Sequence, residues 1–312
     1  MEPVSIDHFS RTLPDRPEAR FLITGATGGL GYFTAEALAV TGAQVLLGAR
    51  DAARGRRAAE AIRRRVGRAK VEIVDLDLTD RDSIEGAAVS VGADRLDGLV
   101  LNAGTTTPPR TRRTTAEGNE FTLATNVIGH AVLTAKLLPA LAATPTASTV
   151  PPPRVVGLGS LSTVIVGLAA DDLQSQREYR PFRAYGLSKH AMHGLIFELD
   201  RRLRREGSGV QALLAHPGYA VDALSPQRPG IVVPRPHERL PIAQGKAAGA
   251  LPTLQALLDP SLSGGAFLGP RWLTRGPAVP VSAVASSRSE SFGSQLFAQL
   301  HTWSGGAVGL RP

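Results

Sequence analysis

The chain has 312 residues, contains no cysteine and carries a formal net charge of +8. Without cysteine it can form no disulfide, use no thiolate nucleophile and bind no zinc through sulfur. A hydrophobic fraction of 43% with 20% charged residues is ordinary for a globular protein. The sequence shows neither a secretory signal nor an apolar run long enough to span a bilayer, so we expect a soluble, cytoplasmic protein.

Most of the excess positive charge lies between Arg50 and Lys70. Within that segment Ala58, Ile62 and Val66 recur at helical spacing, which indicates an amphipathic helix with a solvated arginine face. No aromatic residue is interleaved with these arginines to stack on bases. We therefore favour a solvated helix face over a nucleic-acid surface.

Short apolar runs alternate with helical patterns along the chain. This alternation predicts an α/β fold, a doubly wound seven-stranded parallel sheet of the Rossmann type with helices on both faces. The predicted strands are 20–24, 43–49, 70–76, 96–102, 154–159, 209–215 and 265–269. The predicted helices are 29–41, 51–66, 80–90, 117–142, 183–206 and 239–258, followed by an amphipathic helix at 290–303 that packs back on the body.

No repeat or composition break marks a second domain, so residues 1–312 are interpreted as a single domain. Residues 1–19 are expected to be an N-terminal extension, 144–153 a surface connection, and 286–312 a C-terminal helix and tail. The segment 219–241 is rich in proline and follows the sixth strand. A long loop at the carboxyl end of a parallel strand is well placed to be a substrate lid.

The first strand runs into the glycine turn TGATGGLG, residues 24–31, which a helix follows. Glycine allows a tight turn and a close approach of the backbone to a ligand, and a helix N-terminus offers free N–H groups to a pyrophosphate. Between a strand and a helix, the turn predicts a dinucleotide site rather than a merely tight turn. The residues expected at the ligand are Gly25, Thr27, Gly29, Leu30 and Gly31.

The ends of the next strands predict the adenosine side of that site. Ala49 stands where NAD-preferring folds carry a carboxylate, and Arg50 follows it, which favours NADP(H) over NAD(H). Asp51 is expected to cap the next helix instead of binding the ribose. Asp77 is expected to meet the adenine amino group, and a small-residue turn ends the fourth strand. The cofactor contacts predicted here are Arg50, Asp77, Leu78, Asn102, Ala103 and Gly104.

The segment FRAYGLSKHAMH, residues 182–193, places Tyr185 four residues before Lys189. On a helix the two side chains project from one face. A free phenol is a poor base at neutral pH, and a neighbouring cation is expected to lower its pKa by favouring phenolate. The pair therefore indicates proton-transfer chemistry.

These motifs resemble one family. The glycine turn, the NAG turn, the asparagine of TNVIGH, the serine of VVGLGS and YGLSK occur in the order and approximate spacing of the single-domain short-chain dehydrogenase/reductases, over residues 20–270. Finer matches, such as AHPGY, are similar to the retinol-dehydrogenase-like branch and its bacterial relatives. The resemblance implies one dinucleotide-binding and catalytic domain that transfers hydride between NADP(H) and a ketone, aldehyde or secondary alcohol.

The resemblance also implies catalytic roles for four residues. Tyr185 would protonate the carbonyl oxygen or deprotonate the alcohol, and Lys189 would supply the cation and bind the nicotinamide ribose. Ser160, with Ser162 as its rival, would hold the substrate oxygen. Asn126 would anchor a water in a proton relay, although alone it could be a helix residue bonded to backbone. Further cofactor contacts are expected at Tyr185, Lys189, Pro217 and Gly218.

Other histidines and one aspartate have alternative interpretations. No metal site is expected, because His190 and His193 lack a third ligand nearby and fit packing better, and His216 fits a turn. Where the family has PGxVxT, this chain reads PGYAVD. Asp222 is expected either to accept a hydrogen bond from the nicotinamide carboxamide or to cap a short helix beginning at Ala223. The sequence leaves both open.

Two functions compete with the enzyme. One is a catalytically inactive NADP(H)-binding sensor or scaffold, which the complete motif set disfavours. The other is a nucleic-acid-binding protein driven by the basic segment. The expected partner is a small carbonyl or alcohol substrate, with no nucleic acid and no membrane span. The resemblance is compatible with a homodimer through the helices of Asn126 and Tyr185 and also with a monomer.

Overall fold

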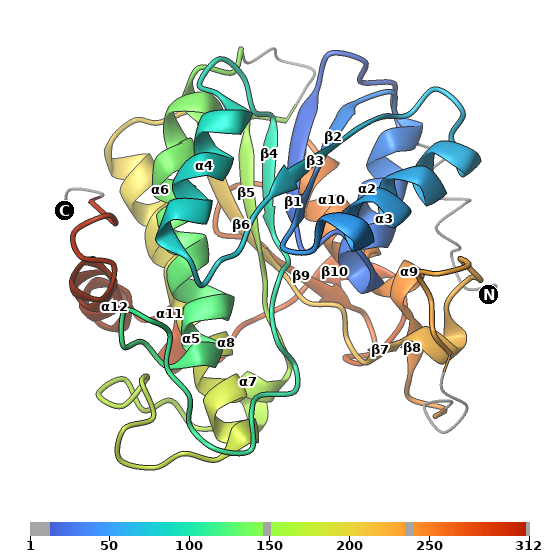
Figure 1. The fold of residues 1–312 in the computed structure, drawn as a ribbon. Coiled ribbons are helices and arrows are strands. Elements are labelled where there is room, and N and C mark those ends of the chain that lie inside the picture. The colour runs from blue at the N-terminus through green and yellow to red at the C-terminus, as the bar shows by residue number, and fades with distance from the viewer. Residues whose placement is uncertain (1–12, 146–150, 235–239, 310–312) are drawn as a thin grey trace.

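A computed structural model describes residues 13–145, 151–234 and 240–309 (Figure 1). Parts of the predicted N-terminal extension (1–12), surface connection (146–150), substrate lid (235–239) and tail (310–312) lie outside the described residues. The remainder folds around one central sheet with helices on both sides (Figure 1).

The central sheet confirms the predicted fold class and corrects its strand count. Its order is β10-β9-β6-β5-β4-β1-β2-β3, and the sheet has eight strands instead of seven. All seven predicted strands are present and parallel, and β10 adds an antiparallel edge next to β9. The strands are β1 (Arg20–Thr24), β2 (Gln44–Ala49), β3 (Lys70–Asp75), β4 (Gly98–Leu101), β5 (Arg154–Leu158), β6 (Gln211–Ala215), β9 (Phe267–Pro270) and β10 (Ala278–Pro280).

The helices follow the predicted pattern except at 239–258, where the prediction is wrong: helical structure begins only at Lys246 and is divided into two short helices. The main ones are α2 (Gly29–Val40), α3 (Ala52–Arg65), α4 (Arg81–Val91), α8 (Pro181–Arg205), α10 (Leu251–Leu258) and α12 (Glu290–Trp303). The long helix predicted at 117–142 is divided into α5 (Phe121–Leu123), the π-helical turn η1 (Ala124–Ile128) and α6 (Gly129–Ala142). Shorter elements are α7 (Ser162–Ile165), η2 (Asp222–Leu224), α9 (Lys246–Gly249) and α11 (Ala285–Arg288).

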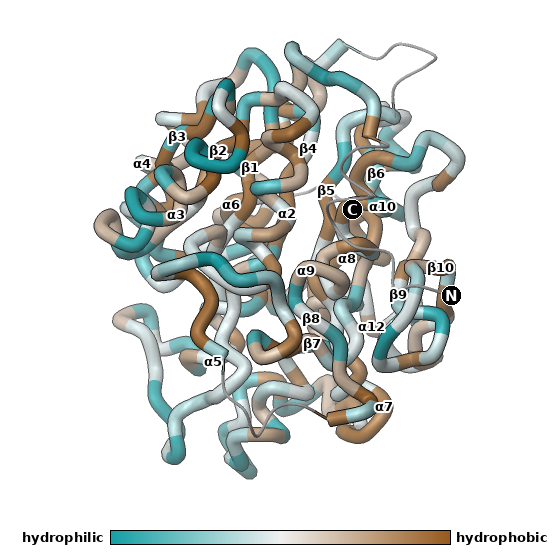
Figure 2. The backbone as a smooth tube through the Cα atoms, turned by 90° about the vertical axis from the view of Figure 1, so that its right-hand side faces the viewer, coloured by the Kyte–Doolittle hydropathy of each residue, from teal (hydrophilic) through white to brown (hydrophobic). Residues whose placement is uncertain are grey.

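An apolar cluster covers each face of the sheet. Successive side chains of a strand point to opposite faces and so contribute to different clusters. Leu22 of β1 belongs to one buried apolar cluster, whereas its neighbours Phe21 and Ile23 belong to the other. Figure 2 shows hydrophobic segments along the central strands and more hydrophilic ones around the outside. This arrangement fixes the carboxyl ends of β1 and β4 side by side. The strand order reverses between these two strands, which is where ligands bind in such sheets.

The described part of the proline-rich segment packs against α2. Arg228 forms a buried two-pronged ion pair with Glu36, with Nε–Oε2 at 2.7 Å and Nη2–Oε1 at 2.6 Å. Val232 is buried in the apolar cluster that also contains Phe33. A small second sheet of β7 (Ala220–Val221) and β8 (Gln244–Gly245) joins the two ends of the segment. The role of the segment as a substrate lid stays a prediction.

The C-terminal helix α12 covers α8, as its apolar pattern predicts. Phe292 and Leu296 lie over Gly194 of α8, where an added Cβ would meet the Phe292 ring at 2.6 Å. A second copy of the chain could reach this part of α8 only if α12 moved away. The homodimer therefore stays an untested expectation.

One helical run among the described residues, Phe121–Ala142, is long and apolar enough to cross a membrane by length and composition alone. Of its most apolar window, 72% is buried inside the protein. Such burial is typical of a core helix.

Candidate active site

Tyr185 and Lys189 lie one turn apart on α8, and their side chains share a face. The ammonium of Lys189 is 5.8 Å from the centre of the Tyr185 ring. It donates a hydrogen bond of 2.8 Å to the carbonyl oxygen of Leu158, the last residue of β5. The lysine is thereby held between the tyrosine and the carboxyl end of a central strand.

The expected direction of the Tyr185 pKa shift is wrong for this structure. Burial raises the pKa of Tyr185, and the hydrogen bond with the Ser160 side chain lowers it to a smaller extent. The Lys189 ammonium, which is hydrogen-bonded to the Leu158 carbonyl, is not among the causes of the shift. Burial also lowers the pKa of Lys189, to about 8. Tyr185 therefore carries its proton at neutral pH.

Ser160, not Ser162, is the serine that meets the tyrosine. The side chain of Ser160 lies close enough to the Tyr185 hydroxyl to lower its pKa, and it also accepts a bond of 3.1 Å from the backbone N–H of Ser162. The hydroxyl of Ser162 is buried in α7 with no partner among the described residues. The strand-end position thus places the hydroxyl of Ser160 beside the phenol.

Asn126 sits in the π-helical turn η1, which the sequence did not predict. Its Oδ1 accepts a bond of 2.9 Å from the N–H of Thr105, and its Nδ2 donates to the Ser188 hydroxyl at 2.9 Å. Ser188 in turn donates to the carbonyl of Tyr185. Single π turns occur frequently at functional sites. Here Asn126 links the loop after β4 to the helix that carries Tyr185, and its role in a proton relay stays a prediction.

His130 is a buried connecting residue that the sequence reasoning missed. Its Nδ1 lies 3.0 Å from the Asn126 carbonyl and its Nε2 lies 2.9 Å from the Thr24 hydroxyl. The Thr24 hydroxyl also accepts the backbone N–H groups of Asn102 and Ala103. Burial lowers the pKa of His130 to about 4, so it is neutral. His130 is the last residue of the motif TNVIGH, and this position was the only sequence feature that could have indicated its role.

The glycine turn has the shape that a dinucleotide phosphate requires. A Cβ on Gly31 would collide with the Asn102 side chain, and one on Gly25 would lie 2.8 Å from the Cα of Ala103. Gly29 has φ +57°, a left-handed conformation that favours glycine. Helix α2 begins there with no side-chain cap, so its first N–H groups have no acceptor within the helix. The residues present therefore fit a bound pyrophosphate.

The adenosine end gathers basic side chains. Arg50 lies 3.9 Å from Asp77, and both are partly exposed at the ends of β2 and β3. Asp51 accepts the N–H of Arg54, so its predicted capping role is confirmed. Arg54 was missed by the sequence reasoning, and its guanidinium lies 4.0 Å from the position of a Cβ on Gly28. The other oxygen of Asp77 accepts the N–H and hydroxyl of Thr79 within its own turn.

Asp222 does not cap a helix, so that alternative is wrong. The short helix η2 begins at Asp222 itself and has no side-chain cap. Oδ2 of Asp222 instead pairs with the Lys246 ammonium at 2.8 Å, and Oδ1 is buried without a partner among the described residues. Lys246 belongs to none of the sequence motifs, so the sequence did not indicate it as a site residue. The contact of Asp222 with a carboxamide stays a prediction.

The remaining histidines have structural contacts. His190 is bonded through Nδ1 to Ser287 and through Nε2 to the Val166 carbonyl, both at 2.6 Å. His193 is buried, and its Nε2 accepts the N–H of Ser160 at 3.4 Å. His216 accepts the N–H of Gly218 at 3.2 Å, which confirms it as a turn residue.

Pro217 and Gly218, two of the predicted cofactor contacts, follow β6 directly. Gly218 has φ +65°, and the Pro217 carbonyl accepts a hydrogen bond from the Gln244 side chain.

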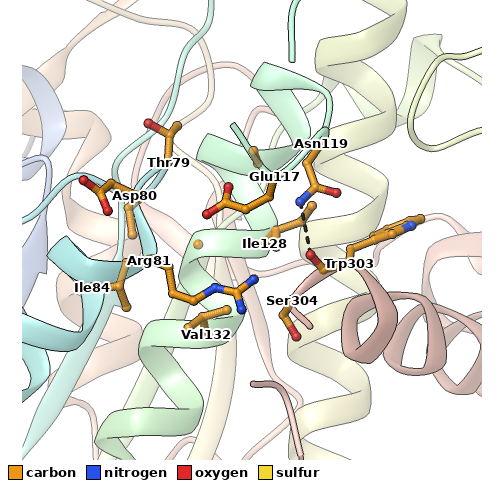
Figure 3. Close-up of a pocket in the computed structure, with 13 residues that line it drawn as sticks. Thr79, Asp80, Arg81, Ile84, Glu117, Asn119, Ile128, Val132, Trp303 and Ser304 are labelled. Carbon is orange, nitrogen blue, oxygen red and sulfur yellow. Dashed lines mark hydrogen bonds between the residues drawn. The ribbon is translucent and has the colours of Figure 1, made fainter. Parts of the chain in front are cut away.

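A separate cavity lies between η1, α4 and the end of α12 (Figure 3). Its volume is about 30 Å³, enough for a water molecule or two. Arg81, Glu117 and Ser304 line it, and Asn119 donates to the Trp303 carbonyl at 3.1 Å beside it (Figure 3). These contacts attach the end of α12 to the body, so we interpret the cavity as part of that packing.

Comparison with known proteins gives one consistent family. The family model described as short chain dehydrogenase matches residues 19–151. Retinol dehydrogenase 12 of Mus musculus is 36% identical over 206 residues, 65% of this chain and 62% of that protein. Polyprenol dehydrogenase of Mus musculus is 35% identical over 208 residues, 66% of this chain and 61% of that protein. The chain thus matches less than two thirds of the length of these curated relatives.

Two solved structures extend the comparison. The crystal structure of an uncharacterised protein from Mycobacterium Paratuberculosis has a TM-score of 0.77 and 31% identity, with 95% of this chain and 97% of that one covered. The Pseudomonas aeruginosa RhlG/NADP active-site complex has a TM-score of 0.51 and 27% identity, with 66% and 74% covered.

Proposed function

Because the chain belongs to the short-chain dehydrogenase/reductase family of oxidoreductases, we propose that it interconverts a ketone or aldehyde and the corresponding alcohol, with NADP(H) as cofactor. The observation that carries this proposal is the meeting of Tyr185, Lys189 and Ser160 at the carboxyl ends of the central strands. When bound, the nicotinamide would supply or accept the hydride. The protein itself would supply the proton and fix the substrate.

The proton chemistry follows from the charges of these side chains. Tyr185 stays protonated because burial raises its pKa, so it can donate to a carbonyl oxygen that gains negative charge. Ser160 would donate a second hydrogen bond to the same oxygen. The ammonium of Lys189 over the ring offsets the negative charge left on the phenol. The arrangement therefore favours carbonyl reduction near neutral pH.

Preference for NADP(H) is supported by the basic side chains at the adenosine end. Arg50 directly follows β2, and the Arg54 guanidinium lies near Gly28 of the glycine turn. Guanidinium groups suit a 2′-phosphate, whereas a carboxylate at the end of β2 would suit a free ribose hydroxyl. Asp77 lies beside Arg50, but its Oδ1 already accepts a hydrogen bond from the N–H of Thr79.

An apolar substrate is supported by side chains at the same edge of the sheet. Helix α7 follows β5 and strand β7 follows β6, so both segments lie at the carboxyl ends of adjacent parallel strands (Figure 1). Large apolar side chains are exposed in these two segments, namely Val164, Ile165, Tyr219 and Leu224, and in the turn after the parallel strand β9, namely Trp272 and Leu273. Exposed apolar groups that gather in one region mark a binding site more often than isolated ones do. Two relatives are named for apolar alcohols, retinol and polyprenol.

The test is an activity assay with the purified protein, NADPH or NADH, and aldehydes of increasing chain length. We expect oxidation of NADPH to be faster than that of NADH, and kcat/KM to rise with each added methylene until the apolar surface is covered. Tight NADPH binding without turnover of any carbonyl would instead favour the inactive sensor or scaffold. Absence of dinucleotide binding would contradict both.

The pH dependence of kcat/KM for carbonyl reduction should report the ionisation of the Lys189 ammonium. Its pKa of about 8 means that the ammonium is charged below that pH and loses its proton above it, while Tyr185 keeps its own. We expect kcat/KM for reduction to be flat at pH 6–7 and to fall about tenfold per unit above pH 8, because kcat/KM reports ionisations of the free enzyme. A profile that stays flat up to pH 9.5 would contradict the role of the ammonium.

A further inference from the structure

Lys246 lies against the glycine turn. Its Nζ and Cδ are each 3.6 Å from the position that a Cβ on Gly29 would occupy. Its backbone N–H donates to the Ser225 hydroxyl at 2.8 Å, and its ammonium pairs with Asp222 at 2.8 Å. The exposed fraction of the Lys246 side chain is 26%. Its cation is therefore held at the start of α2 by contacts outside that helix.

The charge balance at this place favours a cation if a dinucleotide binds. A pyrophosphate carries two negative charges, and the uncapped start of α2 supplies only partial positive charge. Asp222 adds a full negative charge nearby, where the family pattern has a neutral threonine. Without Lys246 the unpaired carboxylate would disfavour phosphates bound at the glycine turn.

Asp222 itself shows an unfilled hydrogen-bonding position. Its Oδ2 accepts from Lys246, whereas its Oδ1 is buried and has no donor among the described residues. A buried acceptor without a donor costs free energy that only a donor group can recover, so the phosphates themselves cannot fill this position. The Oδ2 contact is what holds the Lys246 ammonium beside the glycine turn.

We propose that Lys246 binds the pyrophosphate of the dinucleotide, and that Asp222 holds its ammonium in position. This inference rests on the proposed function, because it assigns a further residue to the same cofactor site. The lysine reaches this site from a segment that follows the proline-rich loop. The pairing of β7 with β8 brings that segment beside Asp222.

The test measures binding and not turnover. Isothermal titration calorimetry would compare the parent protein with Lys246→Met, using three probes: NADPH, ADP-ribose and adenosine 2′-phosphate. Only the first two contain a pyrophosphate. Lys136→Met is a matched control, because Lys136 lies on α6 and pairs with Glu85 away from the glycine turn. Thermal unfolding of each variant shows whether it is folded.

We expect Lys246→Met to bind NADPH and ADP-ribose about tenfold more weakly than the parent, because a charged hydrogen bond is lost. Binding of adenosine 2′-phosphate, and all binding by Lys136→Met, should be unchanged. Equal affinity of Lys246→Met and the parent for NADPH would overturn the inference, as would an equal loss for adenosine 2′-phosphate. A parent that binds no dinucleotide would instead remove the proposed function, and this inference with it.

Discussion

Replacing Tyr185 with phenylalanine should lower kcat for carbonyl reduction by roughly 10³-fold while leaving the Kd for NADPH within about twofold of the parent value. The substitution removes only the hydroxyl group. That group would donate its proton to the substrate oxygen. The ring remains, so its contact with the Lys189 ammonium and the packing of α8 are preserved.

The matched control is Tyr179→Phe. Tyr179 lies just before α8, and its hydroxyl donates to the Pro109 carbonyl at 2.7 Å, away from Ser160. This variant should keep kcat within about threefold of the parent, since only one hydrogen bond is lost. Comparable losses for both variants would show that removal of any tyrosine hydroxyl disturbs the fold, and the assignment of Tyr185 as the proton donor would fail.

Replacing Ser160 with alanine should lower kcat by about 10²-fold, because one donor to the developing oxyanion is lost. Ser162→Ala provides the comparison within the same short segment. The Ser162 hydroxyl is buried and has no partner in the described part of the chain, so its removal leaves no group there unpaired and should change kcat little. Steady-state kinetics of the two variants at saturating NADPH make the measurement. A larger loss for Ser162→Ala than for Ser160→Ala would reverse the assignment.

Much of the fold was predictable because its signals are local. The seven parallel strands and the helices between them are indicated by short apolar runs that alternate with helical patterns, and the topology follows from this alternation. Strand β10 was missed because it spans only Ala278–Pro280 and ends in proline, which gives no strand pattern. It forms only because β9 offers an open edge.

The site was predictable where motifs mark it and not where distant segments meet. Spacing places Tyr185 and Lys189 on one face, but it does not say which atom receives the lysine's hydrogen bond. The Leu158 carbonyl receives it. Burial, which the spacing also does not reveal, raises the pKa of Tyr185. The π turn at Asn126, with the sequence ATNVI, contains no glycine or proline that would mark it in the sequence. Lys246 meets Asp222 only through the pairing of two short strands.

The most direct test of the account is a crystal structure of the protein with NADP⁺ bound. The account predicts the pyrophosphate over the turn at Gly29 and the nicotinamide ring beside the Tyr185 hydroxyl, with Lys189 near its ribose. A dinucleotide bound elsewhere, or a nicotinamide ring separated from Tyr185 by intervening side chains, would contradict it.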